Sequence, residues 1–236
     1  MQEIVFLIHS DMDVATSDKI PIHQRYRFIE MHDPPNESAI SVYQSNPPPQ
    51  LIKSHLGTKF FEKTLKNGKT KFIIVFRNPK DMLVSYYHFY KLGNFSPVGN
   101  WDDFFELFKS KTLCHGDIFD VQLSWWNLRD NPNILILNYE DMLKSPKEAV
   151  RQVATHMGKD ISDDLVAQIV ERTSFKSMKN NPSLNYATMT KKEGDGAFMR
   201  KGVAGDWKNH FSEEQAKYVD ELSDKLFKPV GIHVED

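Results

Sequence analysis

The stretch from Lys71 to Tyr90, KFIIVFRNPKDMLVSYYHFY, constrains the fold more than any other part of the chain. Phe72 to Phe76 is a nearly uninterrupted run of β-branched and aromatic residues, which predicts a strand buried on both faces of a parallel sheet. Pro79 and Asp81 favour the first turn of a helix, and the apolar residues that follow recur at helical spacing. The sequence therefore predicts a strand, a basic turn and a helix, with Arg77 at the carboxyl end of the strand.

This arrangement indicates an anion site. Ligands of open α/β sheets bind beyond the carboxyl ends of the strands, and the free N–H groups of a helix amino terminus attract anions. A second basic segment, FMRKGVAGDWKNHF from Phe198 to Phe211, places Arg200 and Lys201 beside two glycines. Glycines let backbone N–H groups approach an anion closely. We therefore expect a phosphate group to bind at Arg77.

The composition sets further bounds. With 236 residues and 40% hydrophobic content, the chain can bury one sizeable core, so we expect one domain over residues 1–236. Thirty basic and 32 acidic residues give a net charge of −2, which favours neither a nucleic-acid nor a membrane surface. Cys114 is the only cysteine, and the sequence has no signal peptide or apolar run of spanning length. We expect a cytoplasmic protein without disulfides.

The first quarter of the chain is irregular. Met1 to Ser10 predicts an amphipathic helix, and Asp11 to Ser17 predicts a polar turn. Arg25 to Met31 predicts a short buried element. The proline-rich segment from Asp33 to Gln50 predicts a loop, which is either a plain surface segment or a lid over a site. Leu51 to Leu56, LIKSHL, predicts a short strand that places Lys53 and His55 on one face.

The later elements follow clearer patterns. Asn133 to Asn138 predicts a second buried strand, and Tyr139 follows it as Arg77 follows the first. Thr173 to Pro182 breaks the helical pattern with small, basic and amide residues, and a loop composition follows up to Ala197. We expect helices over Phe60–Lys66, Trp101–Ser110, Asp117–Leu128, Lys147–Met157, Ser162–Arg172 and Ser212 to about Phe227.

Two classes of site are disfavoured. No G-x-x-x-x-G-K-[ST] motif occurs, which counts against an ordinary nucleotide kinase. The nine histidines are scattered and form no metal-type spacing. A lone histidine is usually structural, but Lys53 beside His55 strengthens a catalytic interpretation.

Five motifs together resemble the cytosolic sulfotransferases, which use 3'-phosphoadenosine 5'-phosphosulfate (PAPS) as sulfuryl donor. They are, in chain order, LIKSHL, RNPKDMLVSYYHFY, NYEDM, TSFKSMKNNP and FMRKGVAGDWKNHF. The resemblance runs from Met1 to about the final helix. It implies a single α/β domain with a central parallel sheet flanked by helices, related in its phosphate-binding plan to nucleotide kinases.

The resemblance also implies a cofactor site. Arg77 and Ser85 match ligands of the 3'-phosphate, joined by residues of the second basic segment. Tyr139 and Thr173 match contacts to the adenosine, and Phe175 matches a ring that stacks on adenine. The full set of implied cofactor residues is Arg77, Ser85, Tyr139, Thr173, Ser174, Phe175, Lys176, Ser177, Met178, Phe198, Met199, Arg200, Lys201 and Gly202.

The catalytic residues are implied in the same way. His55 matches the base that takes the proton from an acceptor hydroxyl, and Lys53 matches the lysine that helps to neutralise the transferring group. Phe89 matches a position in the acceptor pocket, and the loop from Asp33 to Gln50 would form part of its mouth. No metal is needed, because sulfuryl transfer relies on positioned cations and N–H donors.

One departure from the family concerns the phosphosulfate-binding loop. The family's first strand ends in a loop of the form YPKSGTTW, which this sequence lacks; Met1 matches the residue after its tryptophan. The resemblance thus implies an N-terminally truncated domain. Losing a charge-stabilising donor commonly costs on the order of 100-fold to 1000-fold in rate, so we expect the chain as written to be a poor enzyme or none. A truncated gene model, an internal start and a shortened protein all stay open.

A second departure concerns self-association. The family's dimerisation segment KxxxTVxxxE reads here as Lys208, Ser212, Glu213 and Lys217, so we expect a monomer or a dimer of another type. Two functions stay open after the kinase is disfavoured. The first is a sulfotransferase for a hydroxyl or amine of a small acceptor, and the second is a silent family member that binds nucleotide weakly or acts as a scaffold. Phenol, steroid, amine and aliphatic alcohol acceptors are equally compatible with the sequence.

Overall fold

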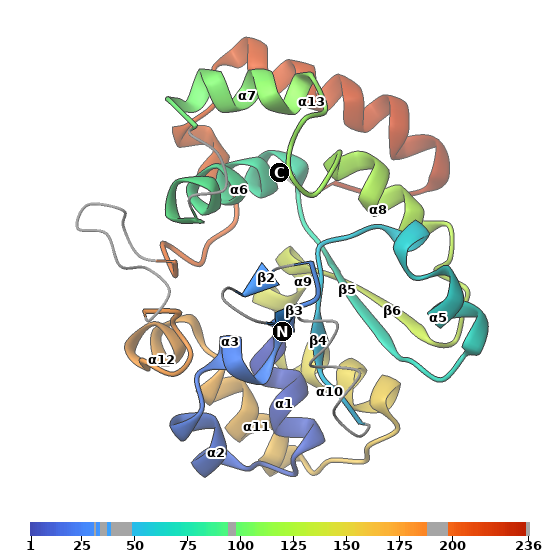
Figure 1. The fold of residues 1–236 in the computed structure, drawn as a ribbon, viewed down its shortest axis with the longest axis vertical. Coiled ribbons are helices and arrows are strands. Elements are labelled where there is room, and N and C mark those ends of the chain that lie inside the picture. Colours follow the sequence, from blue (N-terminus) through green and yellow to red (C-terminus); the bar gives the residue numbers. More distant parts are fainter. Residues whose placement is uncertain (31, 34–36, 39–48, 94–97, 188–197, 235–236) are drawn as a thin grey trace. The chain divides into compact units, whose positions relative to one another are not determined.

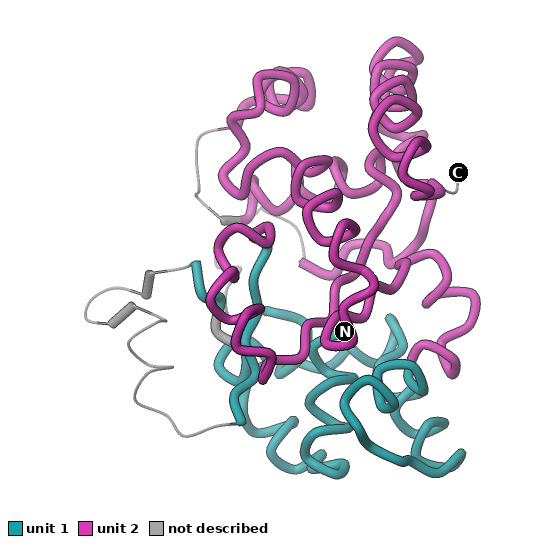
Figure 2. Tube along the Cα trace, turned by 90° about the vertical axis from the view of Figure 1, so that its right-hand side faces the viewer, with its two compact units in different colours: residues 1–56, 150–191 teal, residues 57–149, 192–236 magenta. Residues whose placement is uncertain are grey.

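The computed structural model describes the chain except for residues 31, 34–36, 39–48, 94–97, 188–197 and 235–236. It forms two compact units, and each is assembled from two separate segments of sequence (Figure 2). Unit 1 contains residues 1–56 and 150–191, and unit 2 contains residues 57–149 and 192–236. The motifs singled out in the sequence are therefore divided between the units.

Unit 2 contains the two strands predicted from the sequence, and they pair in parallel. β5 (Phe72–Phe76) runs beside β6 (Ile134–Asn138) over five residue pairs, from Phe72 opposite Ile134 to Phe76 opposite Asn138 (Figure 1). α6 (Pro79–Gly93) follows β5, and α9 (Tyr139–Lys144) follows β6. The α/β class with parallel strands is therefore confirmed.

The turn between β5 and α6 is fixed by side-chain hydrogen bonds. The side-chain oxygen of Asn78 accepts the backbone N–H of Lys80 at 2.8 Å, which satisfies a donor in the first turn of the helix. The backbone N–H of Asn78 itself donates to the buried carboxylate of Glu140 on α9, at 3.1 Å. Pro79 fits the first position of the helix because that position needs no N–H donor. This hydrogen bonding determines where Arg77 leaves the strand.

An aromatic cluster forms the core of unit 2. Phe104 is fully buried, and its ring lies 5.6 to 6.0 Å from those of Tyr86, Tyr87, Tyr90 and Trp101. The remaining elements of the unit are η1 (Thr58–Phe60), α5 (Glu62–Asn67), α7 (Trp101–Lys109), α8 (Ile118–Trp126), η2 (Asp206–Asn209), α13 (Glu213–Leu226) and η3 (Lys228–Val230). Asn100, Asp117 and Ser212 cap α7, α8 and α13, as their residue types favour.

Unit 1 is organised around a buried ion-pair network. Glu3 is fully buried on α1 (Gln2–His9), where it accepts from Arg25 at 2.8 Å and from Arg172 at 3.2 Å. The hydroxyl of Ser17 donates to Glu3 at 2.5 Å, and Arg172 also pairs with Asp18 at 2.6 Å. The charges compensate one another, as burial requires. The network joins α1 to α2 (Val14–Lys19), α3 (Ile22–Arg25) and α11 (Asp163–Arg172).

The strands of unit 1 are very short. β1 (Arg27–Phe28) pairs in parallel with β4 (Ile52–Lys53), and β2 (His32–Asp33) pairs antiparallel with β3 (Glu37–Ser38). The other helices of this part of the chain are α10 (Pro146–Met157), which contains the boundary between the units, and α12 (Phe175–Asn180). The proposed lid between Asp33 and Gln50 lies largely outside the described residues.

Four local predictions were wrong. Helix α2 begins at Val14 within the predicted turn, because the Asp13 carboxylate accepts the N–H of Thr16 at 2.9 Å. Helix α12 occupies the segment predicted to break the helical pattern, and Ser174 caps it. β4 stops at Lys53 because the N–H of His55 donates to Glu30, at 2.7 Å, instead of to a neighbouring strand.

The fourth correction concerns β5, which was predicted to be buried on both faces. Phe76 is buried, but Phe72, Ile73, Ile74 and Val75 are each partly exposed. Phe72 and Ile74 pack against the aromatic cluster despite this exposure. Among the described residues β5 pairs with one strand, β6, so it is less enclosed than a strand in the middle of a larger sheet.

We predict that Phe104→Ala destabilises the protein by about 3 to 5 kcal/mol, because it empties the centre of the aromatic cluster. Phe60→Ala is the matched control, since Phe60 is 59% exposed and its loss should change stability by about 0.5 kcal/mol or less. Urea unfolding followed by tryptophan fluorescence measures both. Equal effects of the two substitutions would contradict the assignment of Phe104 to the core.

Candidate functional site

Arg77 leaves β5 at the carboxyl end of the parallel pair. Its guanidinium carbon lies 4.4 Å from the ring centre of Tyr139, the residue that follows β6, and Nη2 donates to the carbonyl of Val203 at 3.2 Å. Nη2 also lies 3.9 Å from Asp81. Arg77 Nε is buried and has no hydrogen-bond partner among the described residues. The strand ends therefore bring Arg77 and Tyr139 together, as their parallel positions in the sequence indicated, and the segment around residue 203 contacts Arg77.

Asp81 anchors that C-terminal segment to α6. It is buried, and its two carboxylate oxygens accept the backbone N–H groups of Gly205 at 2.5 Å and of Trp207 at 2.9 Å. These two donors flank Asp206 in the sequence. A carboxylate that accepts backbone N–H bonds in a buried place fixes the local backbone strongly. Asp81 thus ties residues 205–207 to the first turn of α6.

Asp206 gathers the cations of the second basic segment. Its buried carboxylate pairs with the guanidinium of Arg200 and accepts from Lys201 at 2.5 Å and from Asn209 at 2.8 Å. Nε2 of His210 lies 3.5 Å from Oδ2 of Asp206. Burial by itself raises the pKa of Asp206, but the hydrogen bonds from Lys201, Asn209 and Arg200 outweigh it and hold that pKa well below the usual range.

Two glycines permit the tight course of this segment. Gly202 has φ of 67° and Gly205 has φ of 81°, both in the left-handed region that side chains other than glycine rarely adopt. The turn at Gly205 places the N–H groups on either side of Asp206 toward Asp81. The glycines predicted to let the backbone approach an anion therefore also let the segment fold onto α6.

The other predicted residues of unit 2 lie in varied surroundings. Ser85 is exposed on α6, and burial raises the pKa of the half-buried Tyr139. Phe198 and Met199 are half-buried at the start of the second basic segment. Phe89, predicted to line an acceptor pocket, has ring contacts with Tyr86 and with His115, at 6.4 and 6.2 Å.

In unit 1, His55 is held by a glutamate that sequence reasoning missed. Nδ1 of His55 lies 2.9 Å from Oε1 of Glu30, which also accepts the backbone N–H of His55. The imidazole stacks on Phe28 with ring centres 5.1 Å apart. Burial raises the pKa of Glu30, but the hydrogen bonds from His55 outweigh it and lower that pKa. A carboxylate at Nδ1 makes that nitrogen the donor and Nε2 the basic nitrogen of the neutral ring.

Lys53 lies beside this pair on a partly apolar surface. Its ammonium is 4.1 Å from the ring centre of Phe28 and 5.6 Å from that of Tyr186. Burial lowers the pKa of Lys53 to about 8, although the negative charge of Glu30 opposes the shift. The residue is half-buried by surface area, with its charged end enclosed by aromatic rings. Lys53 therefore loses its proton much closer to neutrality than an ordinary lysine.

The predicted segment from Thr173 to Met178 spans the junction of α11 and α12. The hydroxyl of Thr173 donates to the carbonyl of Ile169 at 2.7 Å, and Ser174 Oγ accepts the N–H of Ser177 at 3.2 Å. Phe175 is half-buried, and Lys176 is exposed. These residues are contiguous because α12 begins at Phe175, directly after the end of α11.

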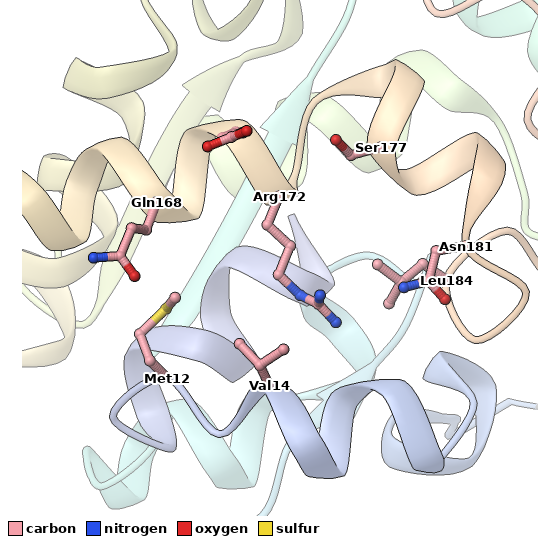
Figure 3. A pocket seen from close by; sticks show the side chains of 8 residues that line it. Met12, Val14, Gln168, Arg172, Ser177, Asn181 and Leu184 are labelled. Atoms are coloured by element: carbon pink, nitrogen blue, oxygen red, sulfur yellow. The ribbon is translucent and has the colours of Figure 1, made fainter.

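A hollow of about 350 Å³ lies beside this junction (Figure 3). It is lined by Met12, Val14, Gln168, Glu171, Arg172, Ser177, Asn181 and Leu184. Ser177 is the one member of this lining that the sequence predicted as a cofactor residue. Arg172, at its centre, is bonded to Glu3, Ser17 and Asp18.

Sequence reasoning missed three carboxylates that contact the candidate site residues: Glu30, Asp81 and Asp206. Glu30 stands in an otherwise apolar run, Phe28 to Met31, which was a usable signal for a buried carboxylate. Asp81 was interpreted only as a helix-start residue. Asp206 lies in the same segment as the cations that it meets, Arg200 and Lys201, so its position there was a usable signal. The partners of Glu30 and Asp81, in contrast, lie 25 or more residues away along the chain.

Fold and site together define an α/β protein with a cluster of basic side chains near the carboxyl ends of two parallel strands. A sulfotransferase domain model matches residues 1–231. The chain is 38% identical over 237 residues to sulfotransferase 1C2 of Homo sapiens, covering 99% of this chain and 80% of that relative. It is also 37% identical to sulfotransferase 1A1 of Bos taurus, covering 91% and 74%. The chain belongs to the sulfotransferase family, and the predicted resemblance is confirmed.

The fold is also similar to those of solved structures. Retinol dehydratase in complex with androsterone and the inactive cofactor PAP superimposes with a TM-score of 0.89 at 25% identity, covering 98% of this chain and 78% of that one. Mouse sulfotransferase SULT7A1 complexed with PAP gives a TM-score of 0.73 at 28% identity, covering 86% and 74%. Sulfuryl transfer is thus the reaction class of the family. Across the described residues, every helix is too short or too polar to traverse a lipid bilayer.

Proposed function

We propose that this chain transfers a sulfuryl group from PAPS to a hydroxyl or amine of a small acceptor. The observation that carries the proposal is the convergence of Arg77, Tyr139 and the Arg200–Lys201 segment within one unit, at the carboxyl ends of β5 and β6. PAP, which contains the 3'-phosphate of the donor, is named in two of the similar solved structures. We also place this reaction in the cytoplasm, because the single cysteine, Cys114, can form no internal disulfide and fits a reducing compartment.

In this proposal unit 2 binds the nucleotide. Arg77, Ser85, Arg200, Lys201 and the backbone at Gly202 hold the 3'-phosphate, since guanidinium groups and N–H donors suit phosphate oxygens. Tyr139 contacts the adenosine. Within unit 1, Thr173 and Phe175 keep the adenosine-binding roles that the family resemblance implies for them. The other residues proposed to bind the nucleotide are Ser174, Lys176, Ser177, Met178, Phe198 and Met199.

Unit 1 supplies the proton acceptor. Nε2 of His55 takes the proton of the acceptor hydroxyl while the acceptor oxygen forms a bond to sulfur. The bond between sulfur and the bridging oxygen breaks, and its electrons leave with the 3',5'-bisphosphate. Glu30 holds Nδ1 and thereby stabilises the imidazolium that forms. Lys53, when protonated, offsets negative charge on the transferring group.

We predict that PAP stabilises the wild-type protein and that Arg77→Ala removes this stabilisation. At a PAP concentration of about 100 times its dissociation constant, the gain should be about 2.7 kcal/mol. Arg129→Ala is a matched control, since Arg129 also lies over an aromatic ring, 5.1 Å from Trp126, and donates to a carbonyl. Thermal unfolding with and without PAP measures the shift. If PAP does not stabilise the wild-type protein, the assignment of unit 2 as the nucleotide-binding unit is wrong.

We predict that His55→Ala lowers the rate of sulfuryl transfer by about 100-fold to 10,000-fold, the usual contribution of a general base. PAP affinity should change little, because the proposal assigns the 3'-phosphate to the cations of unit 2 and gives His55 only the proton transfer. Transfer of radiolabelled sulfate and PAP titration measure the two quantities. An unchanged rate would refute the role of base. PAP binding by a wild-type protein that transfers nothing would instead favour the silent family member.

We predict that transfer slows as pH rises through about 8, because Lys53 then loses the charge that the reaction uses. Lys53→Arg should move this falling limb to higher pH, since a guanidinium stays protonated above pH 12. Lys59→Arg, at an exposed position of the chain, is the control and should leave the profile unchanged. The measurement is kcat/KM from pH 6 to pH 10. If the fall in kcat/KM occurs at the same pH in Lys53→Arg, a group other than Lys53 causes it.

A further inference from the structure

The carboxylate of Asp206 is unusual in the number of basic groups that it meets. Arg200, Lys201 and His210 all approach it, and Asn209 adds an amide donor at 2.8 Å. The side chain of Asp206 is 3% exposed. A single buried negative charge thus faces two permanent cations and a histidine. The local charge balance is positive, which leaves the cluster able to attract a further anion.

The two cations need a partner to hold them in place. The side chains of Arg200 and Lys201 are 29% and 47% exposed, and they belong to consecutive residues of an irregular segment. Each long side chain loses conformational entropy when it is ordered. Neighbouring residues of an extended chain also tend to point in different directions. Their convergence on one point is explained by their common partner, Asp206.

The position of Asp206 is itself fixed from α6. Asp81 accepts the N–H groups of Gly205 and Trp207, the residues on either side of Asp206. Asp81 also lies 3.9 Å from Arg77. The chain of contacts therefore runs from Arg77 through Asp81 and the backbone of residues 205–207 to Asp206 and its two cations. Every member of this chain of contacts belongs to unit 2.

We infer that Asp206 is a positioning residue for the 3'-phosphate: it orders Arg200 and Lys201 before the nucleotide arrives. The inference rests on the proposed function, because it assigns these two cations to that phosphate. Asp206 itself does not touch the nucleotide. If the two cations are already ordered, binding of the nucleotide does not have to include the entropic cost of ordering them. The affinity for the 3'-phosphate is therefore higher.

Asp206→Asn tests the inference, because its electrostatic and positional effects have opposite signs. Removing a negative charge beside the phosphate site would by itself strengthen the binding of PAP. Loss of positioning would weaken it, and only for ligands that carry the 3'-phosphate. We expect the dissociation constant of 5'-AMP divided by that of PAP to fall by about 10-fold or more. This is the size of effect expected when hydrogen bonds between charged groups are lost. Isothermal titration of the full chain with each nucleotide gives the ratio.

Asp163→Asn is the matched control. It makes the same charge change at an exposed aspartate of unit 1 that pairs with Arg151 at 2.5 Å, and it should leave the ratio unchanged. Should Asp206→Asn fail to fold, Asn209→Ala replaces it, since that change removes a donor to Asp206 from an exposed residue without altering charge. We expect a smaller fall, of about 3-fold, from the loss of one neutral hydrogen bond.

The outcomes separate the two hypotheses. If the wild-type protein binds PAP no more tightly than 5'-AMP, the proposed 3'-phosphate site fails. If the wild-type protein prefers PAP and Asp206→Asn keeps or increases that preference, the positioning role is overturned while the proposed function stands. A general loss of stability would weaken both nucleotides alike and leave the ratio unchanged, which also counts against the inference.

Discussion

The parallel pairing of β5 with β6 is the constraint on which the rest of unit 2 depends. Its register sets Phe76 opposite Asn138, so the next residues, Arg77 and Tyr139, emerge side by side. The two turns that follow are joined by the hydrogen bond from Asn78 to Glu140. A shift of one residue would send every side chain of a strand to the opposite face. The cation at the strand end is thus positioned by backbone hydrogen bonds several residues away.

Buried carboxylates provide the second layer of control. Glu3 joins four helices of unit 1, Glu30 holds His55, and Asp81 and Asp206 hold the basic segment of unit 2. Burying a carboxylate costs free energy unless charged or N–H partners compensate it, and each of these four has such partners. Removing one partner would leave an uncompensated charge. This dependence makes the arrangement of basic side chains specific to a single geometry.

The two units present different parts of the proposed chemistry. Unit 2 carries fixed cations at strand ends, which suit a charged nucleotide. Unit 1 carries a histidine oriented by a carboxylate and a lysine whose pKa lies near 8, which suit proton transfer and charge neutralisation near neutral pH. Neither part requires covalent participation of the protein. Sulfuryl transfer, like phosphoryl transfer, is catalysed mainly by positioning of the reactants and by electrostatic stabilisation of the transition state.

The sequence by itself determined the elements with strong local signals: both strands of unit 2, the helix after Arg77, the capped helices and the family. Those signals are periodicity, capping residues and ordered motifs, which act over a few residues. Only the tertiary structure decided where β4 ends, because a carboxylate 25 residues away takes the N–H of His55. It also decided how much of β5 is buried and which acids hold the basic groups. Asp81 shows the reason: its partners are set by folding, since the backbone donors that it accepts from lie more than 120 residues along the chain.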